Sequence, residues 1–215
     1  MTVHHQISDE YLTDYAAGNL AEAFNLAVAS HVSLCPESRA RLDEIEAVGG
    51  AVLEHCETAS MPAGSLEATL ALIAAGPPAA AAPPPAGHCT VLPQPVRDYV
   101  GGDISAVRWR PVGMGVKQAI LSTSDEATAR LLYIPAGCEM PDHGHRGLEM
   151  TLVLQGAFLD GEDRFARGDL EVADDDVSHM PVADEGEDCI CLAVTEGPLK
   201  FSGLLPRLVQ PFLKI

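Results

Sequence analysis

The fold of the second half of the chain is decided by residues 137–149, which read GCEMPDHGHRGLE. This stretch places two imidazoles, His143 and His145, two residues apart, and the carboxylate of Glu149 follows. Residues separated by an even number of positions in a strand point to one face, so the three side chains can converge. His179, which follows a further expected strand, can supply a fourth ligand. Three nitrogens and one oxygen suit zinc, ferrous iron, manganese or nickel.

The surrounding sequence predicts an antiparallel β domain. Short apolar or alternating runs are interrupted by Gly, Pro and Asp, as is usual for short strands joined by turns. The runs lie at residues 129–134, 150–154, 169–172 and 189–194. Such a succession is typical of a β-barrel or a jelly roll.

The spacing of these residues resembles the first motif of the cupin family. From Gly137 to Gly156 the chain reads glycine, five residues, His-x-His, three residues, Glu, six residues and glycine. The second motif is met in part, because Gly168 and His179 stand at its separation. Asp174, Asp176 and Ala183 replace its usual proline, glycine and asparagine. The resemblance implies a metal-binding barrel, with His143, His145, Glu149 and His179 as ligands. We expect Zn²⁺ there, with iron, manganese or nickel as alternatives.

The first 75 residues predict a small helical bundle. Apolar residues recur every three to four positions after Ser8, a third helix begins at Pro36, and a fourth covers residues 66–75. Prolines and alanines then form a stretch with no large apolar side chain, which predicts an extended linker. The expected fold is α + β in two domains: a helical bundle at 1–75, a linker at 76–88 and an antiparallel β-barrel of the cupin or jelly-roll type at 89–215.

A second group of metal-ligand residues lies in the helical part. His31 and Cys35 are four apart on one helix face, and Ser38 follows three residues later. The segment resembles the zinc-binding anti-sigma domain of bacterial anti-sigma factors, whose signature is an N-terminal histidine followed by His-x3-Cys-x2-Cys. Ser38 replaces the last cysteine, and serine is a poor zinc ligand. Zn²⁺ could be held by His5, His31 and Cys35 with a water or another side chain, or the site could be lost to packing.

The resemblance extends over essentially the whole chain. SDEYL at 8–12, YAAG at 15–18, DHGHRGLE at 142–149 and LVLQG at 152–156 together resemble the ChrR-type anti-sigma factors. That family implies a helical domain that binds an extracytoplasmic-function sigma factor. It also implies a cupin domain needed for the response to singlet oxygen or related oxidants.

Two other functions remain open at this point. A metal-dependent cupin enzyme, such as a dioxygenase or an isomerase, could use an open coordination position. The interpretation as a storage or scaffold cupin is less well supported, because such a protein would have no use for the metal ligands. The helical domain favours the anti-sigma interpretation, since a plain cupin enzyme has no need for His31 and Cys35 on an acidic bundle. We therefore expect no catalytic residues.

The composition narrows the class of protein further. The formal net charge of −18 argues against direct binding of nucleic acid, because phosphates would be repelled. Residues 1–75 hold half of this net charge, because their 11 acidic residues are offset only by Arg39 and Arg41. No apolar stretch approaches the length of a membrane span and the start lacks the features of a signal peptide, so we expect a cytoplasmic protein without membrane contact.

The six cysteines are expected to be thiols or metal ligands in a reducing compartment. Cys189 and Cys191 lie two apart in an expected strand and so share one face. They are either two small buried apolar side chains or a redox pair that lines the metal cavity.

Overall fold

The computed structural model describes residues 2–76, 90–144, 146–175, 178–197 and 200–201. Apart from Gly76, the expected linker at 76–88 lies outside these residues. The chain forms two compact units, one of Met1–Glu46 with Thr90–Ile215 and the other of Ala47–Cys89. Contacts therefore divide the chain differently from the expected boundaries at 75 and 89. Within the described ranges, no helix is long and apolar enough to cross a bilayer.

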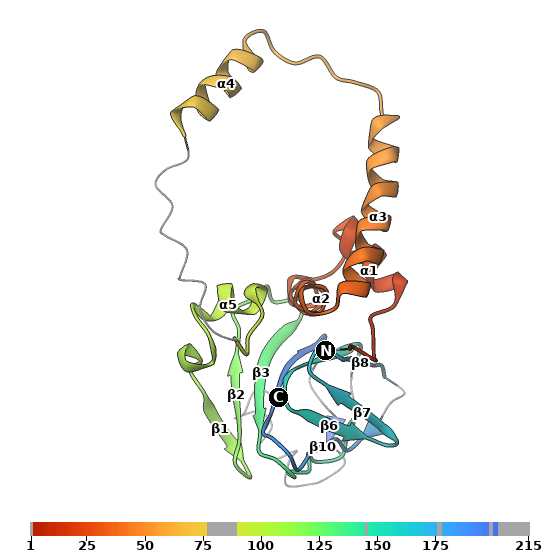
Figure 1. The fold of residues 1–215 in the computed structure, drawn as a ribbon, viewed down its shortest axis with the longest axis vertical. Helices are drawn as coiled ribbons and strands as arrows, with labels where there is room; N and C mark the ends of the chain where they lie inside the picture. The colour runs from red at the N-terminus through yellow and green to blue at the C-terminus, as the bar shows by residue number, and fades with distance from the viewer. Residues whose placement is uncertain (1, 77–89, 145, 176–177, 198–199, 202–215) are drawn as a thin grey trace. The chain divides into compact units, whose positions relative to one another are not determined.

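The larger unit is built on a six-stranded antiparallel sheet (Figure 1). Its strands run in the order β1 (Arg110–Gly113), β2 (Val116–Ile120), β3 (Thr128–Ile134), β11 (Cys189–Thr195), β5 (Glu149–Gln155) and β8 (Leu170–Ala173). On the central strand β11, Leu192 lies opposite Leu131 on one side and Leu152 on the other. These three leucines are fully buried, so the core is centred on β11.

Two three-stranded sheets complete the β domain. One has the order β10 (Val182–Ala183), β6 (Ala157–Asp160) and β7 (Asp163–Ala166), and the other β12 (Lys200–Phe201), β4 (His143–Gly144) and β9 (Ser178–His179). The predicted α + β fold with an antiparallel jelly roll is confirmed. In the part of the chain that is described, the strands form three hydrogen-bonded sheets rather than one closed barrel.

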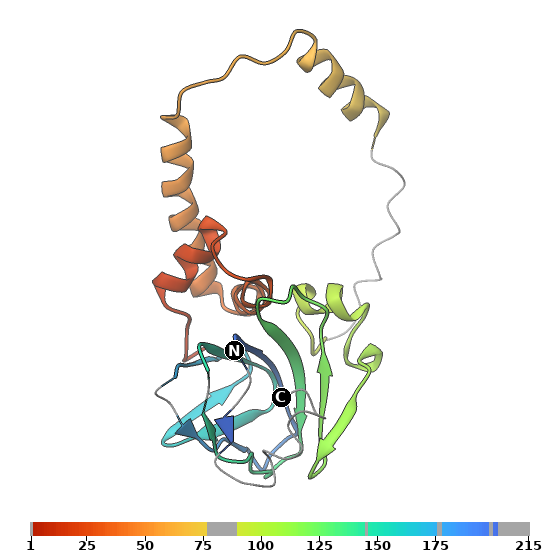
Figure 2. The ribbon, with the colours of Figure 1, turned by 180° about the vertical axis from the view of Figure 1, so that it is seen from behind.

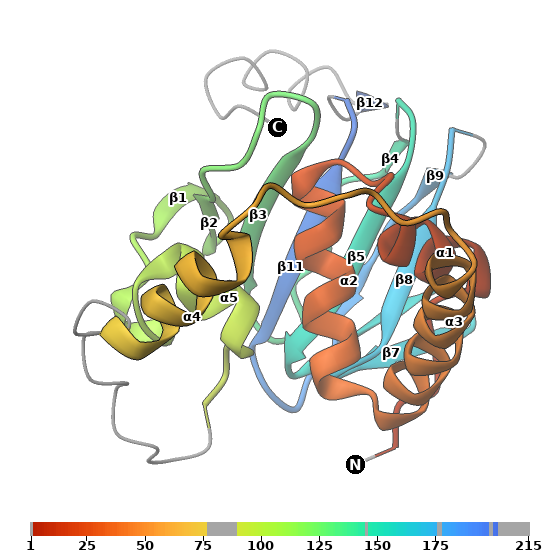
Figure 3. The same ribbon diagram turned by 90° about the horizontal axis from the view of Figure 1, so that it is seen from above.

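Helix α2 (Glu22–Leu34) packs on this β domain and is the reason why the first 46 residues belong to it. Figure 3 shows the helix lying across β11 and β5, and it also contacts β3. Figure 1 and Figure 2 show it between α1 (Asp9–Ala17) and α5 (Gln94–Val100). Its buried residues form a wide face: Ala23, Phe24, Leu26, Ala27, Val28, Ser30, His31 and Val32. The remaining strip is polar, with Glu22 and Ser33 exposed and Asn25 half-buried. A buried face this wide needs neighbours on more than one side, and α1, α5 and the strands of the β domain supply them.

The later helices are much more exposed. Helix α3 (Pro36–Glu54) buries only Ser38 and Leu42, and α4 (Ser65–Ala75) buries no residue. The large apolar side chains on the surface of this region are Val48, Val52, Leu53, Met61, Leu66, Leu70, Leu72 and Ile73. Many of the large apolar side chains of α3, α4 and the segment between them are therefore exposed and do not belong to the core.

The central position of Leu192 leads to a prediction about stability. Leu192→Ala should lower the free energy of unfolding by about 3 kcal/mol, because it removes a fully buried side chain and leaves a cavity. The matched control is Leu53→Ala, which deletes the same atoms from a side chain that is 73% exposed and should cost less than about 0.5 kcal/mol. Urea unfolding followed by circular dichroism measures both. Equal losses in the two variants would contradict the location of the core.

Candidate metal centre

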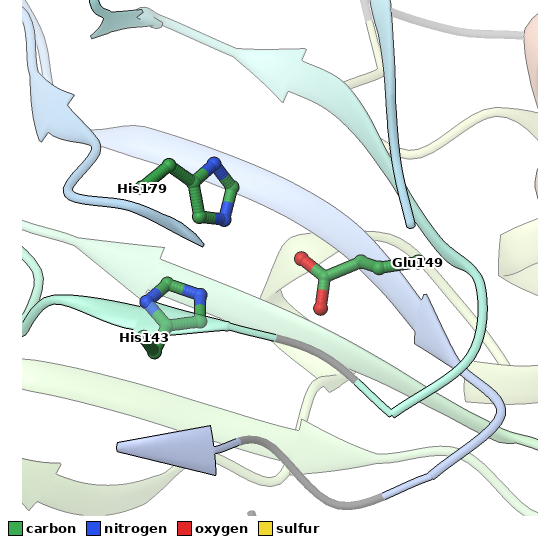
Figure 4. A group of neighbouring side chains, drawn as sticks. All are labelled: His143, Glu149 and His179. Atoms are coloured by element: carbon green, nitrogen blue, oxygen red, sulfur yellow. The ribbon is translucent and has the colours of Figure 1, made fainter. Parts of the chain in front are cut away.

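The strand pairing brings two of the predicted cupin ligands face to face. His143 on β4 is the register partner of His179 on β9, and Glu149 begins β5. Figure 4 shows the three side chains pointing toward a common space. One ligand atom from each lies within 4.8 Å of the others, and all three residues are buried. Two imidazoles and a carboxylate form a donor set that fits a divalent ion. The fourth predicted ligand, His145, lies outside the described residues and stays a prediction.

Hydrogen bonds determine which nitrogen of each ring carries the proton. Nδ1 of His143 lies 2.8 Å from the carbonyl oxygen of Pro141, so it must be the donor. Nδ1 of His179 lies 2.9 Å from Oδ2 of Asp160 and 3.6 Å from Oε1 of Glu171. In both rings Nε2 is therefore the nitrogen that would bind a metal, the arrangement in which a histidine binds a metal through Nε2 while an acceptor holds Nδ1.

The two carboxylates beside His179 also set its charge. Burial lowers the pKa of His179, but the hydrogen bond and charge of Glu171, followed by those of Asp160, outweigh burial and raise the pKa to about 9. Burial raises the pKa of Glu171 itself. Asp160, Glu171 and His179 form a second group whose ligand atoms lie within 4.8 Å of one another. Because this group engages His179 through the Nδ1 side, we interpret it as the pair of acceptors that orients the ring.

Glu149 is held by polar neighbours at the start of β5. The hydroxyl of Thr151 donates to Oε1 of Glu149 at 3.2 Å. Burial lowers the pKa of Arg130, and the charge of Glu149 acts in the opposite direction, so the two groups attract each other. A carboxylate in this position can supply an oxygen ligand to a divalent metal ion.

Asp160 provides a test of this orientation. Asp160→Asn should weaken metal binding about 10- to 100-fold, because the charge that holds Nδ1 of His179 is removed. The change also eases deprotonation of His179, so the comparison belongs near pH 9, where that proton competes least. Competition with a chromophoric chelator gives the affinity. Asp163→Asn, at an exposed position in the same hairpin, is the control and should bind as wild type does. Equal affinities in both variants would show that Asp160 does not orient the ring.

The cysteine pair is buried in a small apolar cluster of its own. The sulfur atoms of Cys189 and Cys191 lie 3.4 Å apart, and both residues pack against Val153, Phe158 and their neighbours. The hydrogen bond with Cys189, together with burial, raises the pKa of the Cys191 thiol well above its ordinary value. A protonated thiol is a poor nucleophile, so the pair fits the interpretation as small core residues.

The N-terminal candidates are only partly brought together. Nε2 of His31 lies 2.9 Å from the hydroxyl of Ser38, and the backbone N–H of Ser38 donates to the sulfur of Cys35 at 3.4 Å. His5 instead stacks on Phe165, with ring centroids 4.2 Å apart. Among the described residues, no group of three ligand atoms within 4.8 Å of one another includes His31 or Cys35.

Sequence reasoning missed Asp160, Glu171 and Asp169. No spacing rule connects Asp160 or Glu171 with His179, because their meeting depends on the folding of three strands. Asp169 accepts the backbone N–H groups of His4 and His5 at 2.6 and 2.9 Å. The acid directly after Gly168 was a weak signal of a turn that binds backbone donors.

Comparison with known proteins places this geometry in a family. Residues 98–200 match the family model of the ChrR cupin-like domain. The anti-sigma-E factor ChrR of Cereibacter sphaeroides is 53% identical over 215 residues, which is the full length of both chains. The crystal structure of Rhodobacter sphaeroides SigE in complex with the anti-sigma ChrR matches with a TM-score of 0.79 and 52% identity, covering 90% of this chain and 99% of that one.

The comparisons confirm the resemblance that the motifs indicated. They extend over the helical part as well as the cupin part, so the alternative of a plain cupin enzyme is not supported. The chain belongs to the ChrR-type anti-sigma factors, a family of regulators and not of enzymes.

Proposed function

We propose that this protein sequesters an extracytoplasmic-function sigma factor and so keeps it from RNA polymerase in the cytoplasm. The observation that carries the proposal is the full-length identity of 53% with a ChrR anti-sigma factor. A ChrR protein has been crystallised together with the sigma factor SigE. Since the similarity covers all regions of the chain, the same type of partner is expected here.

The exposed helices support this type of partner. Leu66, Leu70 and Ile73 follow one another at helical spacing on α4, and all three are more than half exposed. An amphipathic or apolar helix that lies in a groove of a partner is a common mode of recognition. The surplus of acids in residues 1–75 would attract the basic surfaces with which sigma factors contact DNA.

We further propose that the cupin domain is the sensor, and that singlet oxygen or a related oxidant releases the sigma factor. The metal centre supports this role because its ligands come from two different sheets: His143 and His179 from one and Glu149 from another. A metal ion bound there would cross-link the two sheets. Oxidation at the bound metal or its ligands would then act on both sheets at once, and a domain without the metal would lack this response. We propose zinc, and elemental analysis distinguishes it from iron, manganese and nickel.

Transcription in a purified system tests the proposal. The sigma factor, core RNA polymerase and a promoter that depends on that sigma factor are combined with the full chain. Transcription should fall as the chain approaches the concentration of the sigma factor, and light with a photosensitiser should restore it. If an excess of the chain leaves transcription unchanged, the anti-sigma function is refuted. Inhibition that persists under illumination would refute only the sensor role.

A further inference from the structure

The junction between α2 and α3 carries the residues at which the anti-sigma family implies a zinc ion. The donors available there are the imidazole of His31, the thiol of Cys35 and the hydroxyl of Ser38, and all three residues are fully buried. A neutral hydroxyl is a weak ligand for zinc, and structural zinc needs four ligands rather than two. The donor set therefore does not fit a zinc centre.

Both nitrogens of His31 are already engaged with protein groups. Nδ1 lies 2.9 Å from the carbonyl oxygen of Gly168, so Nδ1 donates its proton to that carbonyl. Nε2 then carries the lone pair and accepts from the hydroxyl of Ser38 at 2.9 Å, with the backbone N–H of Ile7 at 3.4 Å. Burial lowers the pKa of His31, which keeps the ring neutral and preserves this arrangement. A metal at Nε2 would have to displace the hydroxyl of Ser38.

The neighbouring candidates do not complete a metal site. The sulfur of Cys35 accepts the backbone N–H of Ser38 and lies 3.6 Å from Oε2 of Glu37. The ring of His5 lies beside Phe165, with Asp169 and Asp163 at 3.7 and 3.8 Å. The donor atoms of His31, Cys35 and Ser38 are thus bound to other protein groups in a way that leaves zinc without its remaining ligands.

The turn at Gly168 and Asp169 is the other half of this network. Gly168 has a φ of 91°, and an added Cβ would lie 2.8 Å from Val3 Cγ2, so only glycine allows the N-terminal segment to approach. Asp169 is 1% exposed, and Oδ1 of its carboxylate accepts the N–H groups of His4 and His5. The backbone N–H of Leu170 donates to the carbonyl oxygen of His5 at 3.0 Å. Helix α2 and the N-terminal segment are therefore fastened to the same turn.

We propose that this chain has replaced the N-terminal zinc centre by a metal-free hydrogen-bonded junction, in which Ser38, His31 and Gly168 fasten α2 to the turn before β8. The junction stabilises the N-terminal part without zinc. It also offers a single thiol, so no disulfide can form between positions 35 and 38. A response of this protein to metal loss or to thiol oxidation must then arise outside this junction.

Metal stoichiometry of the full chain tests the absence of zinc. The wild-type protein, loaded with zinc and desalted, should retain about one equivalent, held by the cupin centre, and not two. In a variant that carries His143→Gln, Glu149→Gln and His179→Gln, zinc should fall below about 0.1 equivalent, and a chelator should leave the melting temperature unchanged. Two equivalents of zinc in wild type would overturn the proposal. So would one equivalent of zinc in the triple variant, if adding Cys35→Ala to that variant removes the zinc. The wild-type measurement remains decisive even if the variant fails to fold.

Substitution of Ser38 tests the hydrogen bond itself. Ser38→Ala should lower the melting temperature by roughly 2–8 °C, because the buried Nε2 of His31 loses its partner, and the loss should be the same with and without chelator. Ser33→Ala is the matched control, since Ser33 is exposed and its hydroxyl bonds within its own helix. Ser38→Cys should increase retained zinc above that of wild type, because it restores a thiolate. An effect of Ser38→Ala that disappears in chelator, or no effect at all, would refute the junction.

Discussion

Replacing Leu70 and Ile73 on α4 by aspartate should weaken sigma-factor binding at least about 100-fold. The two side chains are 55% and 70% exposed, although they are among the most apolar in the helical part. Burial of each at an interface is worth about 1.5–3 kcal/mol, so loss of both removes about 3–6 kcal/mol, or two to four orders of magnitude in affinity. Titration of a labelled sigma factor with the full chain gives the dissociation constants.

The opposite face of the same helix provides the control. Ala68→Asp with Ala71→Asp introduces the same two charges into α4 with a similar cost in helix propensity, but at positions turned away from Leu70 and Ile73. This control should bind within about threefold of wild type, as expected for residues outside the core of an interface. If both double variants lose binding equally, charge or helix stability is responsible and the apolar stripe is not the contact surface.

The central strands could be predicted because each carries a largely apolar run. Strands β3, β5 and β11 begin and end within one residue of the ranges expected from sequence. Strands β4 and β9 have two residues each, which is too few to show any periodicity. They are strands because the segments that carry His143 and His179 pair with each other. The motif therefore predicted His143 and His179 as ligands, and the structure brings the two residues together, although no rule could identify the strands that carry them.

The position of the first 46 residues could not be predicted from helical periodicity. The pattern Phe24, Ala27, His31 identifies the centre of the buried face of α2, whereas the burial of Leu26 and Ser30 shows that this face is wider than the pattern indicates. The many apolar residues of α2 were the available signal, because a helix with a wide buried face needs neighbours on more than one side. The linker predicted at 76–88 stays a prediction, and the contacts divide the chain after Glu46.

The partners of the buried histidines were the least predictable part of the sites. Glu171 belongs to β8 and Asp160 to β6, two strands in different sheets, and both reach Nδ1 of His179. Gly168 accepts from His31 across 137 residues of sequence. Such contacts depend on the register of the strands and on how α2 lies on the sheet. Local sequence patterns predict neither of these features.

Replacing His143, Glu149 and His179 by glutamine in one chain should abolish metal binding by the cupin domain. Wild type is expected to retain about one equivalent of a divalent metal, and the triple variant less than about 0.1, because the remaining predicted ligand, His145, cannot hold the ion alone. The control carries the same three substitutions at the exposed positions His4, His55 and Glu162. Elemental analysis after desalting measures all three proteins. Full metal content in the triple variant would place the metal elsewhere in the chain.

Expressed in the cell, the same triple variant distinguishes the sensing function of the protein from its inhibition of the sigma factor. None of its three substitutions lies on α3 or α4, where the exposed apolar residues are found, so the variant should still repress transcription that depends on the sigma factor. If the metal centre is the sensor, repression should persist under light and photosensitiser, whereas wild type and the control variant should release the sigma factor. Derepression of the triple variant without any oxidant would show instead that the metal holds the protein in its inhibitory form. A normal response of the triple variant to light would show that the metal centre is not the sensor, and that another part of the protein detects the oxidant.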